Sequence, residues 1–367
     1  MLNRELKNEL VEKGLLREVV HQSGELFLYN YTQQAQFDKD AFKTYPILKQ
    51  CRGLILNKEG KMVARPFAKF HNLEEYGSEA TIGELPTFES FEITDKLDGS
   101  LGILYTHNGG VFLATRGSFE SDQAKWATEF LHSTHPIFVK NFLDGVKEGM
   151  DVTFLFEIIY PENRIVVDYK GDNKLILLTV FNNEDGEEMD RESLSEIAFQ
   201  TDIPLVHSFD GIDDFKTIRE ILKRDNAEGF VIKFNNGIRV KMKYEEYVRL
   251  HRIVTGTSSR SLWENMRAGK NVMEIIEHVP DEFHKWASEW ITKLTDEYKF
   301  ILAKATKALE EIPVGESRKN QALLILEKYK DISGTLFQML DGKPYSDGIW
   351  RMIEPKYEQP FKNRDEA

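Results

Sequence analysis

The residues with the clearest chemical potential form a turn between two strand-like stretches. Apolar residues alternate from Phe91 to Lys96, and the turn residues Asp98 and Gly99 follow before a second apolar run. This pattern predicts a hairpin that holds the Lys96 amine at the end of a strand. A lone Lys-x-Asp-Gly sequence is more often a solvated turn than a site, so the other charged residues must decide between these two interpretations.

Two carboxylates stand where a buried strand would keep apolar side chains. Glu157 lies in the middle of "FLFEIIY", and Glu228 immediately precedes the strand-like stretch "GFVIKF". A carboxylate in a sheet core is costly unless it is paired, hydrogen-bonded or bound to a metal. The two positions therefore indicate either structural ion pairs or a site that uses carboxylates.

Lysines and arginines also lie on strand-like stretches or at their ends. Lys241 and Lys243 share one face of "IRVKMK", because side chains alternate along a strand. Three more cations lie at the ends of other strand-like stretches: Arg52, Lys69 and Arg116. Each alone is explained by a snorkelling side chain or an ion pair, but the set suits a substrate with several negative charges.

A lysine surrounded by such groups can act as a nucleophile on phosphorus. The amine attacks only when it is unprotonated, and its reference pKa is about 10.4. Lys241 and Lys243, together with partial burial, are expected to lower the pKa of Lys96. The other cations would neutralise phosphates, and Glu228 would hold Mg²⁺, which prefers oxygen ligands.

Taken in order, these motifs resemble the nucleotidyltransferase motifs of covalent ligases and, more narrowly, the RNA ligase 1 family of the T-even phages. The ordered motifs are Lys96-Leu97-Asp98-Gly99, Thr115-Arg116-Gly117-Ser118, Phe156-Glu157-Ile158, Glu228-Gly229-Phe230-Val231 and Lys241-Met242-Lys243. Further similarities are "YNY" from Tyr29, "CRG" from Cys51, "RPFAKFHN" from Arg65 and "PENRIV" from Pro161. The resemblance extends over residues 25–254 and is weak beyond them.

The resemblance implies a role for each matched position. Lys96 would be the adenylated nucleophile, and Glu228 and Asp281 would bind the metal, Mg²⁺ or Mn²⁺. The residues implied to contact ATP are Tyr29, Arg52, Lys69, Arg116, Glu157, Lys241 and Lys243. Arg116 stands where the family pattern has a lysine, which keeps the charge but changes the hydrogen-bonding geometry toward pyrophosphate.

The 367 residues suggest two domains, because single cores usually stop growing near ~250–300 residues. Short strands joined by hairpins predict an α+β fold for residues 1–254, and the resemblance makes this a nucleotidyltransferase (adenylation) domain of antiparallel sheets with flanking helices. Within it, 164–169 is predicted to be a strand and 212–224 a helix. Residues 255–367 are predicted to form an all-α domain that carries RNA specificity.

Residues 255–367 begin with a short polar segment, and two long helical patterns follow it. The segment 255–261, "TGTSSRS", is small and polar and is predicted to be a linker or hinge. Helices are predicted over 281–311 and 318–333. One buried stripe of the first helix is expected to contain Phe283, Trp286, Trp290, Leu294 and Ile301. The two tryptophans are interpreted as core residues in preference to a surface for stacking bases.

Composition restricts the location and the partners. The net charge of −13 argues against a surface that is basic throughout, so contacts with nucleic acid must use local cationic clusters. No apolar run approaches the ~20 residues that span a bilayer, and the N-terminal residues read as an amphipathic helix and not as a secretion signal. A single cysteine, Cys51, excludes an intramolecular disulfide. We expect a cytoplasmic location (the host cytoplasm for a viral protein) and no membrane partner.

The resemblance predicts an ATP-dependent RNA ligase that works through lysyl-AMP and RNA-adenylate, in RNA or transfer-RNA repair. Its substrate would be RNA with 5′-phosphate and 3′-hydroxyl ends, such as nicked transfer RNA, and it would work alongside a polynucleotide kinase-phosphatase. The alternatives are a DNA ligase, an RNA capping enzyme, or a catalytically degenerate RNA-binding relative. The helical character after Thr255 argues against the first two, which usually carry a β-barrel there.

Overall fold

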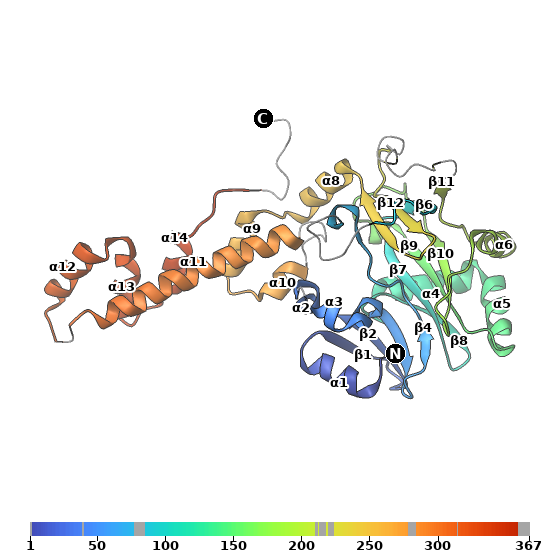
Figure 1. Cartoon of the computed structure of the whole chain (residues 1–367), viewed down its shortest axis with the longest axis horizontal. Coiled ribbons are helices and arrows are strands. Elements are labelled where there is room, and N and C mark those ends of the chain that lie inside the picture. The colour runs from blue at the N-terminus through green and yellow to red at the C-terminus, as the bar shows by residue number, and fades with distance from the viewer. Residues whose placement is uncertain are drawn as a thin grey trace. The chain divides into compact units, whose positions relative to one another are not determined.

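The computed structural model describes residues 2–38, 40–76, 85–209, 212, 218, 224–277, 284–313 and 315–358. The chain divides into two compact units, Met1–Val254 and Thr255–Ala367. Sheets and helices build the first unit, and the described part of the second is helical (Figure 1). The predicted α+β class, with an all-α C-terminal region, is confirmed.

Three sheets form the first unit, and almost all of their neighbouring strands are antiparallel. The first sheet has the order β1 (Leu16–Val20), β2 (Leu26–Tyr31), β3 (Arg52–Asn57) and β4 (Met62–Ala64). The second has the order β10 (Lys174–Asn182), β9 (Val152–Ile159), β7 (Ser100–His107) and β8 (Gly110–Ala114). The third has the order β11 (Ser208–Phe209), β6 (Phe91–Lys96), β12 (Gly229–Phe234), β13 (Arg239–Lys243) and β5 (His71–Asn72). Only the short β13–β5 pair among the described strands is parallel, which agrees with strands joined mostly by hairpins.

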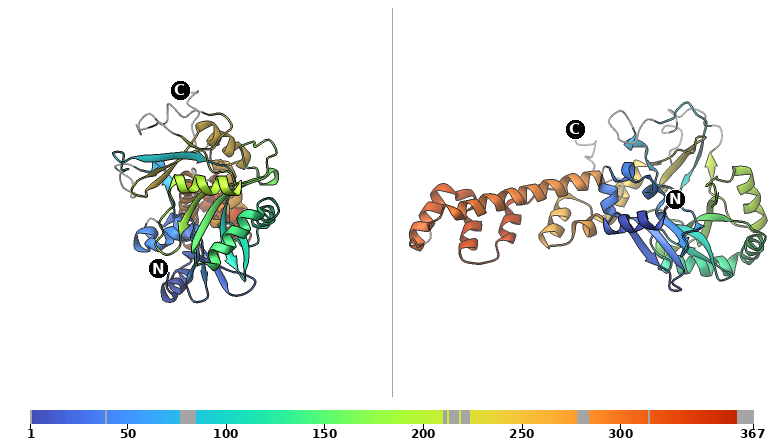
Figure 2. Two further views of the ribbon diagram at one scale, coloured as in Figure 1. Left: turned by 90° about the vertical axis from the view of Figure 1, so that its right-hand side faces the viewer. Right: turned by 60° about the horizontal axis from the view of Figure 1, so that its bottom comes forward.

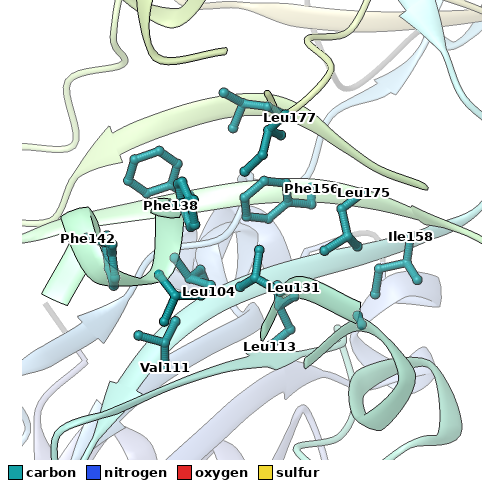
Figure 3. Close-up of a cluster of buried hydrophobic side chains, with 14 of the residues drawn as sticks. Leu104, Val111, Leu113, Leu131, Phe138, Phe142, Phe156, Ile158, Leu175 and Leu177 are labelled. Carbon is teal, nitrogen blue, oxygen red and sulfur yellow. The ribbon is translucent and has the colours of Figure 1, made fainter. Parts of the chain in front are cut away.

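Helices cover the second sheet and enclose the main core. The α-helices in the described residues of this unit are α1 (Arg4–Glu12), α2 (Gln33–Phe37), α3 (Ala41–Thr44), α4 (Asp122–Thr134), α5 (Pro136–Lys147), α6 (Arg191–Thr201) and α8 (Glu245–Thr255). Phe138 and Phe142 of α5 pack with Phe156 of β9 and Leu104 of β7 (Figure 3). Since Phe156 is fully buried, its neighbour Glu157 points to the opposite face of the same strand. The core therefore fixes which face of β9 presents a carboxylate.

The helical unit is organised along one long helix. Its helices are α9 (Ser259–Arg267), α10 (Val272–Glu277), α11 (His284–Glu310), α12 (Arg318–Lys328), α13 (Ser333–Leu340) and α14 (Ser346–Met352). Figure 2 shows α12 and α13 beside the C-terminal part of α11, where Ala305, Ala308 and Ile325 share a small buried core. In the described residues, no helix is long and apolar enough to cross a membrane.

Several sequence predictions need correction. The strands before and after the turn at Asp98 and Gly99 do not form a hairpin, because β6 pairs with β12 in the third sheet and β7 pairs with β8 and β9 in the second. Residues 164–169 are not a strand: they form an irregular loop between β9 and β10. The predicted linker is also partly wrong, because Thr257, Ser258 and Ser259 are buried and Ser258 caps α9. The helix predicted over 212–224 lies almost wholly outside the described residues.

The buried stripe predicted for α11 is only partly correct. Leu294 is buried, but Trp286 and Trp290 are half-buried and touch each other edge to face. The ammonium of Lys293 lies 4.4 Å from the ring centroid of Trp290. Phe283 lies outside the described residues. The two tryptophans therefore lie at the margin of the core, half-buried, and are not fully buried core residues.

Candidate active site

One buried carboxylate joins the two lysines that the sequence places at strand ends. Lys96 ends β6 and pairs with Gly229, the first residue of β12. The Lys96 ammonium nitrogen is 2.9 Å from Oε1 of Glu228, and the Lys243 ammonium is 2.9 Å from the same oxygen. Glu228 is only 4% exposed. These charge-assisted contacts offset the cost of burying the carboxylate.

Two glycines allow the strands to approach closely enough for this contact. A Cβ on Gly229 would come within 2.0 Å of the Met242 carbonyl oxygen, and its φ of +153° disfavours other residues. A Cβ on Gly99 would lie 2.5 Å from the Ile158 carbonyl oxygen. The Lys-x-Asp-Gly and Glu-Gly motifs therefore need glycine for steric reasons.

The Lys96 side chain opens into a cleft of about 230 Å³ between the second and third sheets. Alternate residues of β6 and β12 line it in cross-strand rows, with Thr94 opposite Val231 and Glu92 opposite Lys233. Leu101, Glu157 and Leu178 line it from the second sheet, and Arg52 lines it from β3. The cleft thus runs from the charged Lys96 end past an apolar middle. A larger cavity of about 400 Å³, beside His107 and Lys147, contains none of the predicted site residues.

Glu157 is held against the turn that follows Lys96. Its Oε1 accepts a hydrogen bond of 2.9 Å from the backbone N–H of Gly99. Burial raises the pKa of Glu157 to about 8, with the nearby charge of Glu228 adding to the rise and that of Lys96 opposing it. Without a nucleotide, the folded protein therefore keeps a proton on this carboxyl at neutral pH.

This proton makes stability depend on pH in a defined direction. The folded-state pKa of about 8 lies above the ordinary value of 4.5, so between these values the folded chain binds more protons than the unfolded chain. The contribution of Glu157 to the free energy of unfolding accordingly falls as the pH rises through this window. Glu157→Gln cannot titrate, so its melting temperature without nucleotide should fall less steeply across the window than that of the wild type. Parallel melting profiles of the two proteins would contradict this assignment.

Three cations from separate segments face one aromatic ring. The centroid of Tyr31 lies 5.9 Å from Arg52, 5.4 Å from Lys69 and 5.2 Å from Arg116. Arg52 also donates a 3.0 Å hydrogen bond to the Tyr31 hydroxyl. The structure therefore gathers the three cations that the sequence assigned to the phosphates. The ring gives them a common support through cation–π contacts.

Tyr29 lies elsewhere, although the sequence placed it at the nucleotide. It is 3% exposed, packs in the core of the first sheet, and donates to Glu18 over 2.8 Å. Burial raises its pKa, so the hydroxyl stays a donor. It does not line the cleft, and Tyr31, two residues on, is the tyrosine beside the cations. The "YNY" pattern contains both tyrosines, and the sequence alone does not determine which ring lies beside the cations.

Asp98 and Tyr247 are site residues that the sequence analysis did not assign. The buried Asp98 carboxylate accepts hydrogen bonds from the backbone N–H groups of Val166 and Val167, both 2.8 Å, and from the Tyr247 hydroxyl, also 2.8 Å. The Lys243 ammonium lies 5.1 Å from the Tyr247 ring centroid. Asp98 thus ties the turn after Lys96 to α8. The spacing of Tyr247 four residues after Lys243, one turn into a helix, was the available signal.

The metal-ligating potential of the site rests mainly on Glu228. Among the described residues, no three His, Cys, Asp or Glu side chains converge as a metal cluster. Mg²⁺ is commonly held by one or two carboxylates together with substrate phosphates, and Glu228 could supply one of them. Asp281 lies outside the described residues. Lys241 lies on the same face of β13 as Lys243 and pairs with Val231, which lines the cleft.

Comparisons with known proteins agree with the motifs. A family model described as RNA ligase matches residues 50–248, more than half of the chain. A protein of Autographa californica nuclear polyhedrosis virus, "Putative bifunctional polynucleotide kinase/RNA ligase", is 28% identical over 69% of this chain and 37% of its own length. A "Putative RNA ligase" of Thermovibrio ammonificans is 31% identical over 56% of this chain and 54% of its own. The chain therefore spans about half, or less, of these relatives.

A solved structure shares the fold. The chain superimposes on a "Putative ATP-dependent DNA ligase from Aquifex aeolicus" with a TM-score of 0.50 and 17% identity. The match covers 93% of this chain and 88% of the other. At this identity the likeness concerns the fold alone.

Proposed function

The chain belongs to the RNA ligase family, and on that premise we propose that it joins the 5′-phosphate and 3′-hydroxyl ends of RNA using ATP. The observation that carries the proposal is that Lys96 and Lys243 both contact the buried Glu228, and that Lys96 lines a cleft that Arg52, Lys233 and Arg239 also line. A nucleophilic amine, a carboxylate for a metal and cations for phosphates are what nucleotidyl transfer to lysine requires.

The first step forms a bond between the Lys96 nitrogen and the α-phosphorus of ATP. The amine supplies the electron pair, loses its proton, and the bond from phosphorus to pyrophosphate breaks. Glu157 and the apolar middle of the cleft would bind the nucleoside. The cations around Tyr31 would accept the negative charge of the departing pyrophosphate. Lys241 and Lys243 would hold the α-phosphate.

The later steps reuse the same groups. An oxygen of the RNA 5′-phosphate attacks the phosphorus of lysyl-AMP, and the bond to nitrogen breaks with the electron pair returning to Lys96. The 3′-hydroxyl of the second end then attacks the RNA 5′-phosphorus and AMP leaves. Bound at Glu228, Mg²⁺ or Mn²⁺ would screen the phosphate charges in these transfers. Since the first two steps both develop charge on the AMP phosphate, one set of cations can serve both.

The direct experiment uses ATP labelled at the α-phosphate. We expect label on the chain in the presence of magnesium, transfer of the label to 5′-phosphorylated RNA, and release as AMP when the RNA is sealed. An identical assay with DNA ends separates an RNA ligase from a DNA ligase. A chain that binds ATP and RNA but never becomes labelled would be a catalytically degenerate relative, contrary to the proposal.

The ends that such an enzyme seals must be prepared by another activity. The viral relative is named as both a polynucleotide kinase and an RNA ligase, and this chain covers only 37% of it. We propose that a kinase-phosphatase activity supplies the 5′-phosphates and 3′-hydroxyls that are joined, with broken RNA such as nicked transfer RNA as the shared substrate.

The helical unit is proposed to select the RNA. It lacks the ligase motifs but leaves Trp286 and Trp290 half-exposed, with Lys293 over the second ring. Aromatic rings beside cations stack unpaired bases. A fragment of residues 1–254 should therefore still form lysyl-AMP, but should lose the preference of the full chain for a nicked hairpin over a plain single strand. Unchanged preference in a folded fragment would place RNA selection in the first unit.

A further inference from the structure

The irregular loop at 164–169 is fastened to the turn that follows Lys96. It has no strand partner, although its sequence is apolar enough to have predicted a strand. Two of its backbone N–H groups, those of Val166 and Val167, donate to Asp98 Oδ2 over 2.8 Å. In return, the Asp98 N–H donates to the Tyr169 hydroxyl over 2.8 Å. Backbone groups that would otherwise pair in a sheet are thus satisfied by the Lys-x-Asp-Gly turn.

The same loop is fastened on its other side to Asn226. The Asn226 Oδ1 accepts from the Asp168 N–H over 2.8 Å, and the Asn226 Nδ2 donates to the Asp168 carbonyl oxygen over 2.8 Å. One side-chain amide therefore makes the pair of hydrogen bonds that a neighbouring strand residue would make. Asn226 has a φ of +51°, a left-handed conformation that asparagine tolerates better than most residues.

Asn226 stands two residues before Glu228, where the ladder between strands stops. The last β6–β12 pair is Lys96 with Gly229, so Glu228 lies just beyond it. On the β13 side the Glu228 carbonyl oxygen accepts from the Tyr244 N–H over 2.9 Å. On the β6 side, the segment before Glu228 is held by side chains: Arg224 contacts Asp95, and Asn226 contacts the loop.

We propose that Asn226 is a positioning residue for lysine adenylation, because it fixes the approach of Glu228 to Lys96 through the 164–169 loop. The loop is the common element: Asp98 anchors it beside Lys96, and Asn226 anchors it beside Glu228. The inference rests on the proposed function, since positioning matters only if Lys96 and Glu228 act together. The side chain of Asn226 is exposed, so the fold does not depend on its burial.

The test replaces Asn226 by glycine in the full chain. Asn226→Gly keeps the left-handed backbone available and removes both hydrogen bonds to Asp168. The matched control is Asn108→Gly, since Asn108 is also an exposed asparagine, with a φ of +49°, in the β7–β8 turn. Both variants carry the same entropic cost of a new glycine.

Asn226→Gly should slow single-turnover formation of lysyl-AMP at saturating ATP by about 10-fold, the effect of two lost neutral hydrogen bonds. The ATP concentration that gives half the maximal rate should change by less than about 3-fold, because no nucleotide contact is removed. Asn108→Gly should leave both quantities unchanged. Hydrogen exchange at the Asp168 amide should become faster in Asn226→Gly, while exchange at Ile93 in the β6–β12 ladder should not.

Different outcomes overturn different claims. A wild-type chain that forms no lysyl-AMP overturns the proposed function and this inference with it. If the wild type is labelled, an Asn226→Gly rate equal to that of the wild type overturns the inference alone. So does a loss confined to ATP affinity, or an unchanged exchange rate at Asp168, which would show that the bonds seen here do not hold the loop.

Discussion

Lys96→Ala is expected to lower covalent labelling of the chain by ATP by at least ~10³-fold, because it removes the attacking atom. Lys96 ends β6 inside the cleft, with its nitrogen 2.9 Å from Glu228. The variant should still seal RNA that already carries a 5′-adenylate, since that step needs no enzyme adduct. Gel detection of labelled protein, followed by sealing of adenylated RNA, measures the two activities in one preparation.

Two further variants make this result specific. Lys96→Arg keeps a cation next to Glu228 but offers no amine of suitable basicity, so it should also fail to become labelled while melting close to the wild type. Lys125→Ala removes an exposed lysine on α4 that pairs with Glu120, and it should be labelled normally. Labelling of Lys96→Ala at the wild-type level would assign the nucleophile to another residue.

Much of the first unit could be predicted because its signals are local. Hairpins with alternating apolar residues, such as β12 and β13 around the turn at Gly237, carry their register in the sequence. The 164–169 loop shows the limit of this reasoning. Its apolar run fits a strand, yet its hydrogen bonds go to Asp98 and Asn226, which are distant in sequence. Tertiary contacts therefore override the local pattern there.

The candidate site, like the fold, could be predicted only in part. The residue types predicted a lysine, two carboxylates and a set of cations, but not that Glu228 would contact both Lys96 and Lys243. That contact depends on the pairing of β6 with β12, two strands separated by more than a hundred residues. The positions of Tyr29 away from the cations and of Tyr31 beside them have a related cause. Both point to one face of β2, and only the packing of other segments decides which ring the cations meet.

Glu228→Gln should lower the rate of lysyl-AMP formation by ~10²-fold or more, a loss typical of removing one charged group that acts on the transition state. Glutamine keeps the shape and one acceptor oxygen but removes the negative charge that Lys96 and Lys243 share. Its neutral amide is also a poorer magnesium ligand than a carboxylate. Because the lost negative charge itself acts on the transition state, raising the magnesium concentration should not restore the rate in single-turnover assays.

The matched control for this loss is Glu157→Gln, which changes a carboxylate that lines the cleft. Glu157 accepts from the Gly99 N–H, a hydrogen bond that a glutamine oxygen can keep. Its substitution should act mainly on the use of ATP, by ~0.5–1.5 kcal/mol if one neutral hydrogen bond to the nucleotide is lost. Glu228→Gln must first melt cooperatively, because two lysines left beside a neutral side chain also destabilise the fold. Equal rate losses in both variants, with unchanged ATP dependence, would contradict these roles. Glu228 would then not act through the metal while Glu157 acts through the sugar of ATP.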